Sequence, residues 1–256
     1  MLAIIGGSGL TMLSNLEVSH REVVRTPYGE PSGAVVFGQI CGQPAMFLPR
    51  HGYGHTIPPH TVNYRANLWA LGHHKATGVI SVASVGGIRS DLNPGDIVIP
   101  DQIIDYTWGR KATFFEGNGS PVTHVDFTEP YDNHLRTRIC EAGAALGIAM
   151  KSGGVYAATQ GPRLETAAEI NRLERDGADI VGMTGMPEAV LARELGLPYA
   201  AISVVANHAA GRGSSANGIQ FASLEVVLQE AMCRVRAVIE KLVGCQNDCP
   251  STGGPG

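Results

Sequence analysis

Short apolar runs, bounded by glycine, proline or polar residues, recur along the whole 256-residue chain. Several of these runs lack strict polar alternation, as expected for strands in a sheet that is covered on both faces. They predict strands at Leu2–Ile5, Val35–Ile40, Ala45–Leu48, Val79–Val85, Ile97–Ile99, Val155–Thr159, Ile180–Met183 and Tyr199–Ala206.

Apolar positions with helical spacing lie between these runs. Pro187 suits the first turn of one such helix, and Gly196 is a natural C-terminal cap for it. Ser223 is a favourable N-cap for a final helix whose apolar stripe ends at Gly244. Further helices are predicted at Thr61–Ala76, Asn133–Leu146 and Glu165–Asp176. Strand and helix alternate throughout, so the predicted class is α/β in one domain over residues 1–243.

Two segments lack this periodicity. Trp108–Pro130 is polar and contains a lone His124, and a stretch of that length is typically a functional or interaction loop. Residues 244–256 have little to bury and are predicted to form a mobile tail. Cys245 and Cys249 in this tail could be bridged, although the pattern of five cysteines without Cys-x-x-Cys pairs favours free thiols and no metal site.

Composition excludes some classes of function. Charged residues make up 16% of the chain, below the roughly 25% of average domains, which suggests surface buried against partner subunits. The net charge of -4 argues against a nucleic-acid-binding protein. The apolar run at Leu2–Ile5 is too short for a signal peptide or membrane span, so we expect a cytoplasmic protein without membrane contact.

Glu165 and Asn207 each follow a predicted strand and can read the edge of a heterocycle. An ionised Glu165 only accepts hydrogen bonds, whereas Asn207 both donates and accepts. A 6-oxopurine matches this pair because its N1–H donates while O6 and N7 accept. Adenine would set a bare N1 acceptor against the carboxylate. Alternatively, Glu165 is an acid favoured by a helix N-terminus, and Asn207 is a turn residue.

Candidate anion ligands follow two other predicted strands. The turn Gly6–Gly9 could direct backbone N–H groups and the Ser8 hydroxyl at a phosphate, or it is a simple strand exit. Arg50 carries a planar fork that fits phosphate oxygens, and His51 adds a donor. The pair could equally be a surface ion-pair residue and a core histidine.

Eight motifs, in order along the chain, resemble the family of trimeric purine nucleoside phosphorylases and methylthioadenosine phosphorylases. They are Gly6-Gly7-Ser8-Gly9-Leu10, Leu48-Pro49-Arg50-His51-Gly52, His55-Thr56-Ile57-Pro58-Pro59, Val62-Asn63-Tyr64-Arg65-Ala66-Asn67, Gly86-Gly87-Ile88-Arg89, Pro94-Gly95-Asp96-Ile97-Val98, Gly161-Pro162-Arg163 and Gly182-Met183-Thr184. The likeness is greatest to the branch that acts on methylthioinosine. It implies a phosphorylase/hydrolase-like fold with a central mixed sheet, a homotrimer, and no cofactor besides the co-substrate phosphate.

The resemblance also assigns roles to individual positions. It implies that Ser8, Arg50, His51, Ser84 and Thr184 bind phosphate. Methylthioadenosine phosphorylases usually have a threonine at the position of Ala83, so one side-chain contact is missing and Ser84 is expected to substitute.

The base, sugar and 5′ ends follow from the same resemblance. Asn207 and Glu165 are the expected catalytic and base-binding residues, with Met183 and Leu164 beside the base and sugar. A methionine at a strand end is also commonly plain core. The expected 5′-methylthio pocket consists of His55, Pro59, Ile219 and, from a neighbouring subunit, His124.

The expected reaction is phosphorolysis of S-methyl-5′-thioinosine to hypoxanthine and 5-methylthioribose 1-phosphate. Glu165 and Asn207 oppose a methylthioadenosine phosphorylase, whereas a general inosine and guanosine phosphorylase differs only at the 5′ end. A non-catalytic nucleoside-binding module is the alternative from another class, but such a module would not need Ser8, Arg50, His51 and Thr184.

Overall fold

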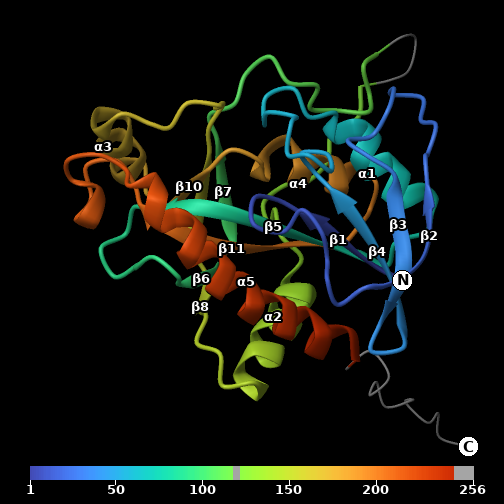
Figure 1. Cartoon of the computed structure of the whole chain (residues 1–256). Coiled ribbons are helices and arrows are strands. Elements are labelled where there is room, and N and C mark those ends of the chain that lie inside the picture. Colours follow the sequence, from blue (N-terminus) through green and yellow to red (C-terminus); the bar gives the residue numbers. More distant parts are fainter. Residues whose placement is uncertain (118–121, 245–256) are drawn as a thin grey trace, which may run out of the picture.

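The computed structural model describes residues 1–117 and 122–244, with only the backbone at 221–223. Within these residues the strands form one eleven-stranded sheet flanked by helices (Figure 1). The strands are β1 (Leu2–Gly6), β2 (Glu17–Glu22), β3 (Val35–Ile40), β4 (Gln43–Pro49), β5 (Gly78–Gly87), β6 (Ile97–Ile99), β7 (Gln102–Asp105), β8 (Lys151–Ser152), β9 (Val155–Ala158), β10 (Ile180–Gly182) and β11 (Tyr199–His208). The helices are α1 (Tyr64–His73), α2 (Asn133–Ala145), α3 (Ala167–Arg175), α4 (Gly185–Glu194) and α5 (Phe221–Gly244), with a 3-10 turn at Gly213–Ser215.

The long strand β5 organises the sheet. It pairs in parallel with β1 near its start and with β11 along most of its length, and Gly86 and Gly87 at its end pair with antiparallel β10. The sheet continues through β4, β3 and β2 on one side and through β9 and β7 on the other, while β6 and β8 extend it from β11. Parallel and antiparallel pairs therefore occur together, which confirms the mixed α/β sheet predicted above.

Both faces of the central strands are buried. In β1, Leu2 and Ile4 belong to a core cluster with α2 and α5, whereas Ala3 and Ile5 belong to a second cluster with α1 and α4. Figure 1 shows α2 and α5 together on one side of the sheet and α1 and α4 on the other. This two-sided burial explains the apolar runs without alternation.

Capping residues mark the start of α1 and the end of α4, but not the start of α5. Asn63 caps α1 by accepting from the backbone N–H of Ala66, so this helix is shorter than the predicted Thr61–Ala76. Gly196 has a φ of 64° just after α4, which confirms it as the C-terminal glycine of that helix. The prediction that Ser223 is the N-cap of the last helix is wrong, because α5 begins at Phe221.

The apolar pattern missed the polar elements. All six positions of β2 are exposed, since this strand forms the edge of the sheet and buries no face. Strands β7 and β8 are short and partly exposed, and they too were not predicted. The predicted mobile tail, with the possible Cys245–Cys249 bridge, lies outside the described residues after Gly244.

Candidate active site

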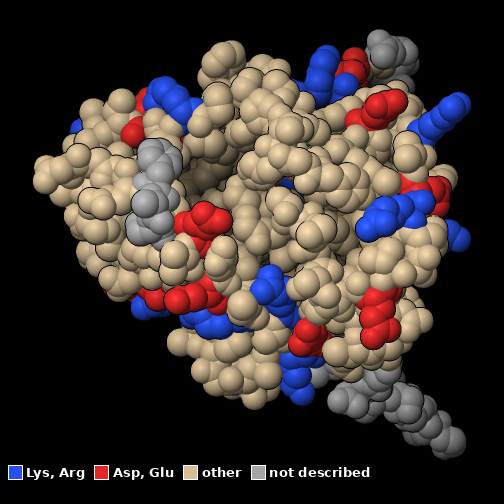
Figure 2. All heavy atoms as spheres, in the orientation of Figure 1, with Lys and Arg blue, Asp and Glu red and all other residues tan. Residues whose placement is uncertain are grey.

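A cavity of about 790 Å³ opens near the carboxyl ends of the central parallel strands, a size typical of small-molecule sites. In Figure 2 the molecule is hollowed to the upper left of its centre, and the atoms around the hollow are mostly uncharged. The structure brings thirteen residues discussed above to its wall: Ser8, Arg50, His51, His55, Pro59, Ala83, Ser84, Leu164, Glu165, Met183, Thr184, Asn207 and Ile219. His124 is exposed and does not line the cavity of its own chain.

The turn after β1 brings Ser8 to the cavity. A Cβ at Gly7 would lie 2.6 Å from both Arg50 Nη1 and the Val82 carbonyl oxygen, so only glycine fits this close approach. Gly9 has a φ of 83°, in the region that favours glycine. The Ser8 Oγ lies 3.4 Å from His55 Nε2, so an expected phosphate ligand and an expected residue of the 5′ pocket are neighbours in the cavity.

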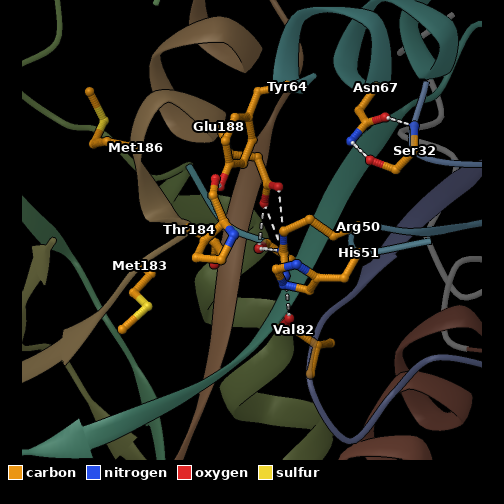
Figure 3. A network of polar contacts seen from close by, with 12 residues as sticks. Ser32, Arg50, His51, Tyr64, Asn67, Val82, Met183, Thr184, Met186 and Glu188 are labelled. Atoms are coloured by element: carbon orange, nitrogen blue, oxygen red, sulfur yellow. Dashed lines mark hydrogen bonds and ion pairs between the residues drawn. The ribbon is translucent and has the colours of Figure 1, made fainter. Parts of the chain in front are cut away.

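Arg50 is fully buried and forms an ion pair with Glu188 of α4 (Figure 3). Its Nε and Nη2 donate to the two Glu188 carboxylate oxygens at 2.7 and 2.9 Å. Nη2 also donates to Ser81 Oγ at 2.6 Å, and Nη1 donates to the Val82 carbonyl at 3.1 Å. Burial opposes the positive charge, but the Glu188 carboxylate outweighs it, so the pKa of Arg50 is raised above its ordinary value.

This geometry changes the expected role of Arg50. We predicted that its fork grips phosphate in a bidentate manner, but the structure gives the fork to Glu188. Of the five guanidinium N–H groups, one on Nη1 remains without a partner in the described residues, on a residue that lines the cavity. Sequence reasoning missed Glu188, whose only signal is a carboxylate on an otherwise apolar stretch of helix.

His51 also differs from the sequence-based expectation. Its Nδ1 lies 2.8 Å from the carbonyl oxygen of Ile57, which can only accept, so Nδ1 carries a proton. Burial and the neighbouring Arg50 charge lower the pKa of His51 to about 4. The ring is therefore neutral at pH 7 and Nε2 is an acceptor, whereas we had expected His51 to add a donor.

Glu165 lies in the loop before α3 rather than in the helix. Thr166 is the N-cap, and with Glu169 it forms a capping box, so Glu169 is the acid at this helix N-terminus. Glu165 Oε1 accepts from Thr159 Oγ1 at 2.6 Å, and the carboxylate lines the cavity. The structure therefore does not support the alternative interpretation, in which Glu165 is the acidic residue at a helix N-terminus.

Asn207 lies at an irregularity in β11, where the pairing with β5 shifts between Val205 and Asn207. Such bulges redirect side chains and are common beside active sites. The Asn207 amide nitrogen donates to the His208 carbonyl at 2.6 Å, which leaves a second amide hydrogen and Oδ1 at a cavity-lining position.

Gly161, which follows β9, lies close to the cavity-lining residues Met183 and Pro59. A Cβ at Gly161 would lie 2.4 Å from Met183 Sδ and 3.1 Å from Pro59 Cγ, so glycine allows the methionine side chain to pack against this loop. Leu224 and Leu228 of α5 line the cavity together with Ile219 and provide further apolar surface.

Arg110 is a second residue that sequence reasoning missed. Its Nη1 donates to the carbonyls of Met183 and Met186 at 2.7 and 2.6 Å, and its Nη2 donates to those of Thr159 and Gln160 at 3.2 and 2.8 Å. It therefore ties the segment after β10, which carries Met183, to the start of the loop between β9 and α3, which carries Glu165. The only signal was its position in the non-periodic segment Trp108–Pro130, which we predicted to be functional.

The mixed sheet, and a cavity lined by Ser8, Arg50, His51, Glu165 and Asn207, match what the sequence predicted for a nucleoside phosphorylase type of protein. Residues 1–244 match the Phosphorylase superfamily, and the chain belongs to this family. It is therefore an enzyme of the purine nucleoside phosphorylase type, as the names of its relatives also indicate.

Relatives and solved structures agree with this assignment. The chain is 50% identical to the probable S-methyl-5′-thioinosine phosphorylase of Pseudomonas syringae pv. tomato, over 94% of this chain and 97% of the relative. It is 46% identical to the 6-oxopurine nucleoside phosphorylase of Pyrococcus furiosus, over 82% and 80%. The structure of methylthioadenosine phosphorylase from Schistosoma mansoni with adenine superposes with a TM-score of 0.91 at 32% identity, over 96% and 91%.

Two further features of the described residues concern metal ions and membranes. No group of three or more histidine, cysteine, aspartate or glutamate side chains in residues 1–117 and 122–244 is arranged to hold a metal ion. In the same part of the chain, no helix has the length and hydropathy needed to cross a bilayer.

Proposed function

We propose that the protein catalyses reversible phosphorolysis of S-methyl-5′-thioinosine, giving hypoxanthine and 5-methylthioribose 1-phosphate. The observation that carries this proposal is that the Glu165 carboxylate and the Asn207 amide both line the cavity. The names of two relatives, at 50% and 46% identity, support this base: one is named for methylthioinosine and the other for 6-oxopurine nucleosides.

Glu165 and Asn207 recognise the base in this proposal. With Oε1 held by Thr159, the Glu165 carboxylate accepts from the purine N1–H. The free Asn207 amide hydrogen donates to N7 or O6, where negative charge develops as the glycosidic bond breaks. Adenine presents no N1–H, so the same carboxylate would face a lone pair.

The anion end holds the second substrate. Ser8, Thr184, the free Arg50 N–H and the backbone around Ser84 are the proposed phosphate donors. The ribose takes on oxocarbenium character in such glycosyl transfers, and a phosphate held beneath it stabilises that charge before its oxygen attacks C1′. This scheme needs no covalent enzyme intermediate and no cofactor.

The 5′ end distinguishes this substrate from inosine. Ile219, Leu224 and Leu228 offer apolar surface, which favours a methylthio group over a hydroxyl by roughly 1–3 kcal/mol. We expect kcat/KM for methylthioinosine to exceed that for inosine by about tenfold or more in a phosphate-dependent base-release assay. Ile219→Ser should narrow this ratio without changing the preference for hypoxanthine over adenine. A native ratio below one would contradict the 5′ assignment and favour a general 6-oxopurine nucleoside phosphorylase.

The proposed assembly is a homotrimer in which His124 enters the neighbouring subunit's 5′ pocket. The low fraction of charged residues and the exposed position of His124 support a subunit contact. Light scattering at working concentration should give three times the 26.9 kDa chain mass. A monomeric mass with full activity would contradict it.

A further inference from the structure

The anion end of the cavity contains an unusual combination of charges. The positive charge of Arg50 is paired with the Glu188 carboxylate, and both side chains have 0% exposure. His51 beside it is neutral, and among the described lining residues Arg163 is the only other Lys or Arg side chain. Arg163 is exposed, and its guanidinium is bound to both carboxylate oxygens of Glu169 at 2.7 Å. An anion at this end is therefore held mainly by directional hydrogen bonds rather than by net charge.

His51 differs from the proposed phosphate donors at this end, because its Nε2 is an acceptor. Its Nδ1 is committed to the Ile57 carbonyl at 2.8 Å, and this is the one side-chain hydrogen bond of the ring among the described residues, so Nε2 is left for a ligand. His51 is 6% exposed as a residue and lines the cavity, next to Arg50 and with its ring 4.6 Å from that of His55. Figure 3 shows the ring beside the Arg50 guanidinium. A neutral imidazole with a proton on Nδ1 presents a lone pair at Nε2.

We propose that His51 Nε2 accepts a hydrogen bond from a hydroxyl of the bound anion and so selects phosphate or arsenate over sulfate. This inference rests on the proposed function, because it concerns the anion consumed by that reaction. At pH 8 phosphate and arsenate are mainly dianions that keep one O–H, whereas sulfate is a dianion of similar size without a proton. Sulfate would set an oxygen lone pair against the Nε2 lone pair.

The expected discrimination follows from this mismatch. A binding site that leaves a buried polar group unpaired typically loses affinity tenfold or more. Charge and size are nearly equal between sulfate and the phosphate dianion, so neither term supplies such a difference. The pairing of Arg50 with Glu188 strengthens the effect, because no free buried cation compensates for the mismatched lone pairs.

The test compares three anions on the full chain at pH 8 and constant ionic strength. Base release from methylthioinosine gives the KM for phosphate and for arsenate, and competition gives the Ki for sulfate. We expect arsenate within about threefold of phosphate and sulfate at least about tenfold weaker. A sulfate Ki within threefold of the phosphate KM would overturn the inference. An absence of base release with either phosphate or arsenate would instead contradict the proposed function.

Two variants test whether the discrimination against sulfate depends on His51. His51→Gln offers an amide N–H₂ to the anion, so the sulfate-to-phosphate ratio should fall to about threefold or less. His55→Gln changes the other histidine at this end and should leave the ratio within about twofold of native, whatever its effect on the rate. Equal ratios for native protein and His51→Gln would contradict the role of His51.

Nitrogen-15 NMR of the native protein needs no variant. With saturating phosphate, the His51 ring should show a protonated Nδ1 and an unprotonated Nε2. An imidazolium signal in the phosphate complex would show that His51 donates to the anion, which would overturn the inference independently of the kinetics.

Discussion

The Arg50–Glu188 pair gives the sharpest prediction about stability. Glu188 accepts four hydrogen bonds, two from Arg50, one from Ser81 Oγ at 2.6 Å and one from the Tyr199 hydroxyl at 2.9 Å. Burial and the Glu188 charge raise the pKa of Tyr199 well above its usual range, so this hydroxyl remains a donor. Three side chains thus direct four hydrogen bonds at one fully buried carboxylate.

Glu188→Gln keeps the shape of the side chain but removes its charge and adds two hydrogens among these donors. Breaking a buried ion pair from one side leaves an uncompensated charge and costs about 3–5 kcal/mol. We therefore expect the free energy of unfolding to fall by that amount. A change of this size is a large part of the total stability of a typical domain.

Urea denaturation followed by circular dichroism measures this difference, provided that the slope with denaturant is unchanged. The double variant Arg50→Met/Glu188→Leu is the matched control. It removes both charges and should recover part of the lost stability, because the Ser81 and Tyr199 hydroxyls still lose their acceptor, while phosphorolysis stays impaired because the Arg50 N–H is gone. A single variant within about 1 kcal/mol of native would refute the reasoning that the two charges depend on each other.

Further predictions concern the base site, its support and the effect of pH. Glu165→Ala and Asn207→Ala should each lower kcat/KM for 6-oxopurine nucleosides about a hundredfold with little change in Tm, and unchanged kinetics in both would contradict the base assignment. Thr159→Val removes the 2.6 Å hydrogen bond to Glu165 and should lower the same kcat/KM about tenfold, whereas Thr159→Ser should retain it; equal values for the two variants would argue against this positioning role. Since burial and Arg50 lower the pKa of His51 to about 4, the unfolded chain binds a proton there first as pH falls. Stability should therefore drop between about pH 6.5 and 4, by roughly 2–3 kcal/mol from this group, and pH-dependent urea curves should show a shallower drop in His51→Gln.

Much of the fold was predictable because it is recorded in local sequence patterns. Central strands such as β1 and β5 are apolar on both faces, and the glycine after α4 has a conformation that its residue type favours. The edge strand β2 buries nothing, so no apolar pattern marks it. The start of α5 shows the same limit, since a good capping residue at Ser223 did not determine where the helix begins.

The sequence was enough to name several residues that line the cavity, but not the hydrogen bonds that they form. Ser8 follows β1, Glu165 lies in the loop between β9 and α3, and Asn207 lies near the end of β11; the structure brings all three to one cavity. The partner of Arg50 is 138 positions away in the chain, and no local signal links it to Glu188.

The protonation of His51 depends in the same way on a tertiary contact. The Ile57 carbonyl fixes which ring nitrogen carries the proton, and burial fixes the charge. Residue type alone identifies a candidate ligand, whereas its donor or acceptor role is set by contacts that form only in the folded chain.

The central claim is that Glu165 and Asn207 select a 6-oxopurine. Methylthioinosine and methylthioadenosine have the same sugar and 5′ group and differ only at the base edge, so their kcat/KM values in saturating phosphate test this claim most directly. We predict that methylthioinosine leads by at least about a hundredfold, and that Glu165→Ala reduces the lead. A native enzyme that cleaves methylthioadenosine equally well or better would contradict the account.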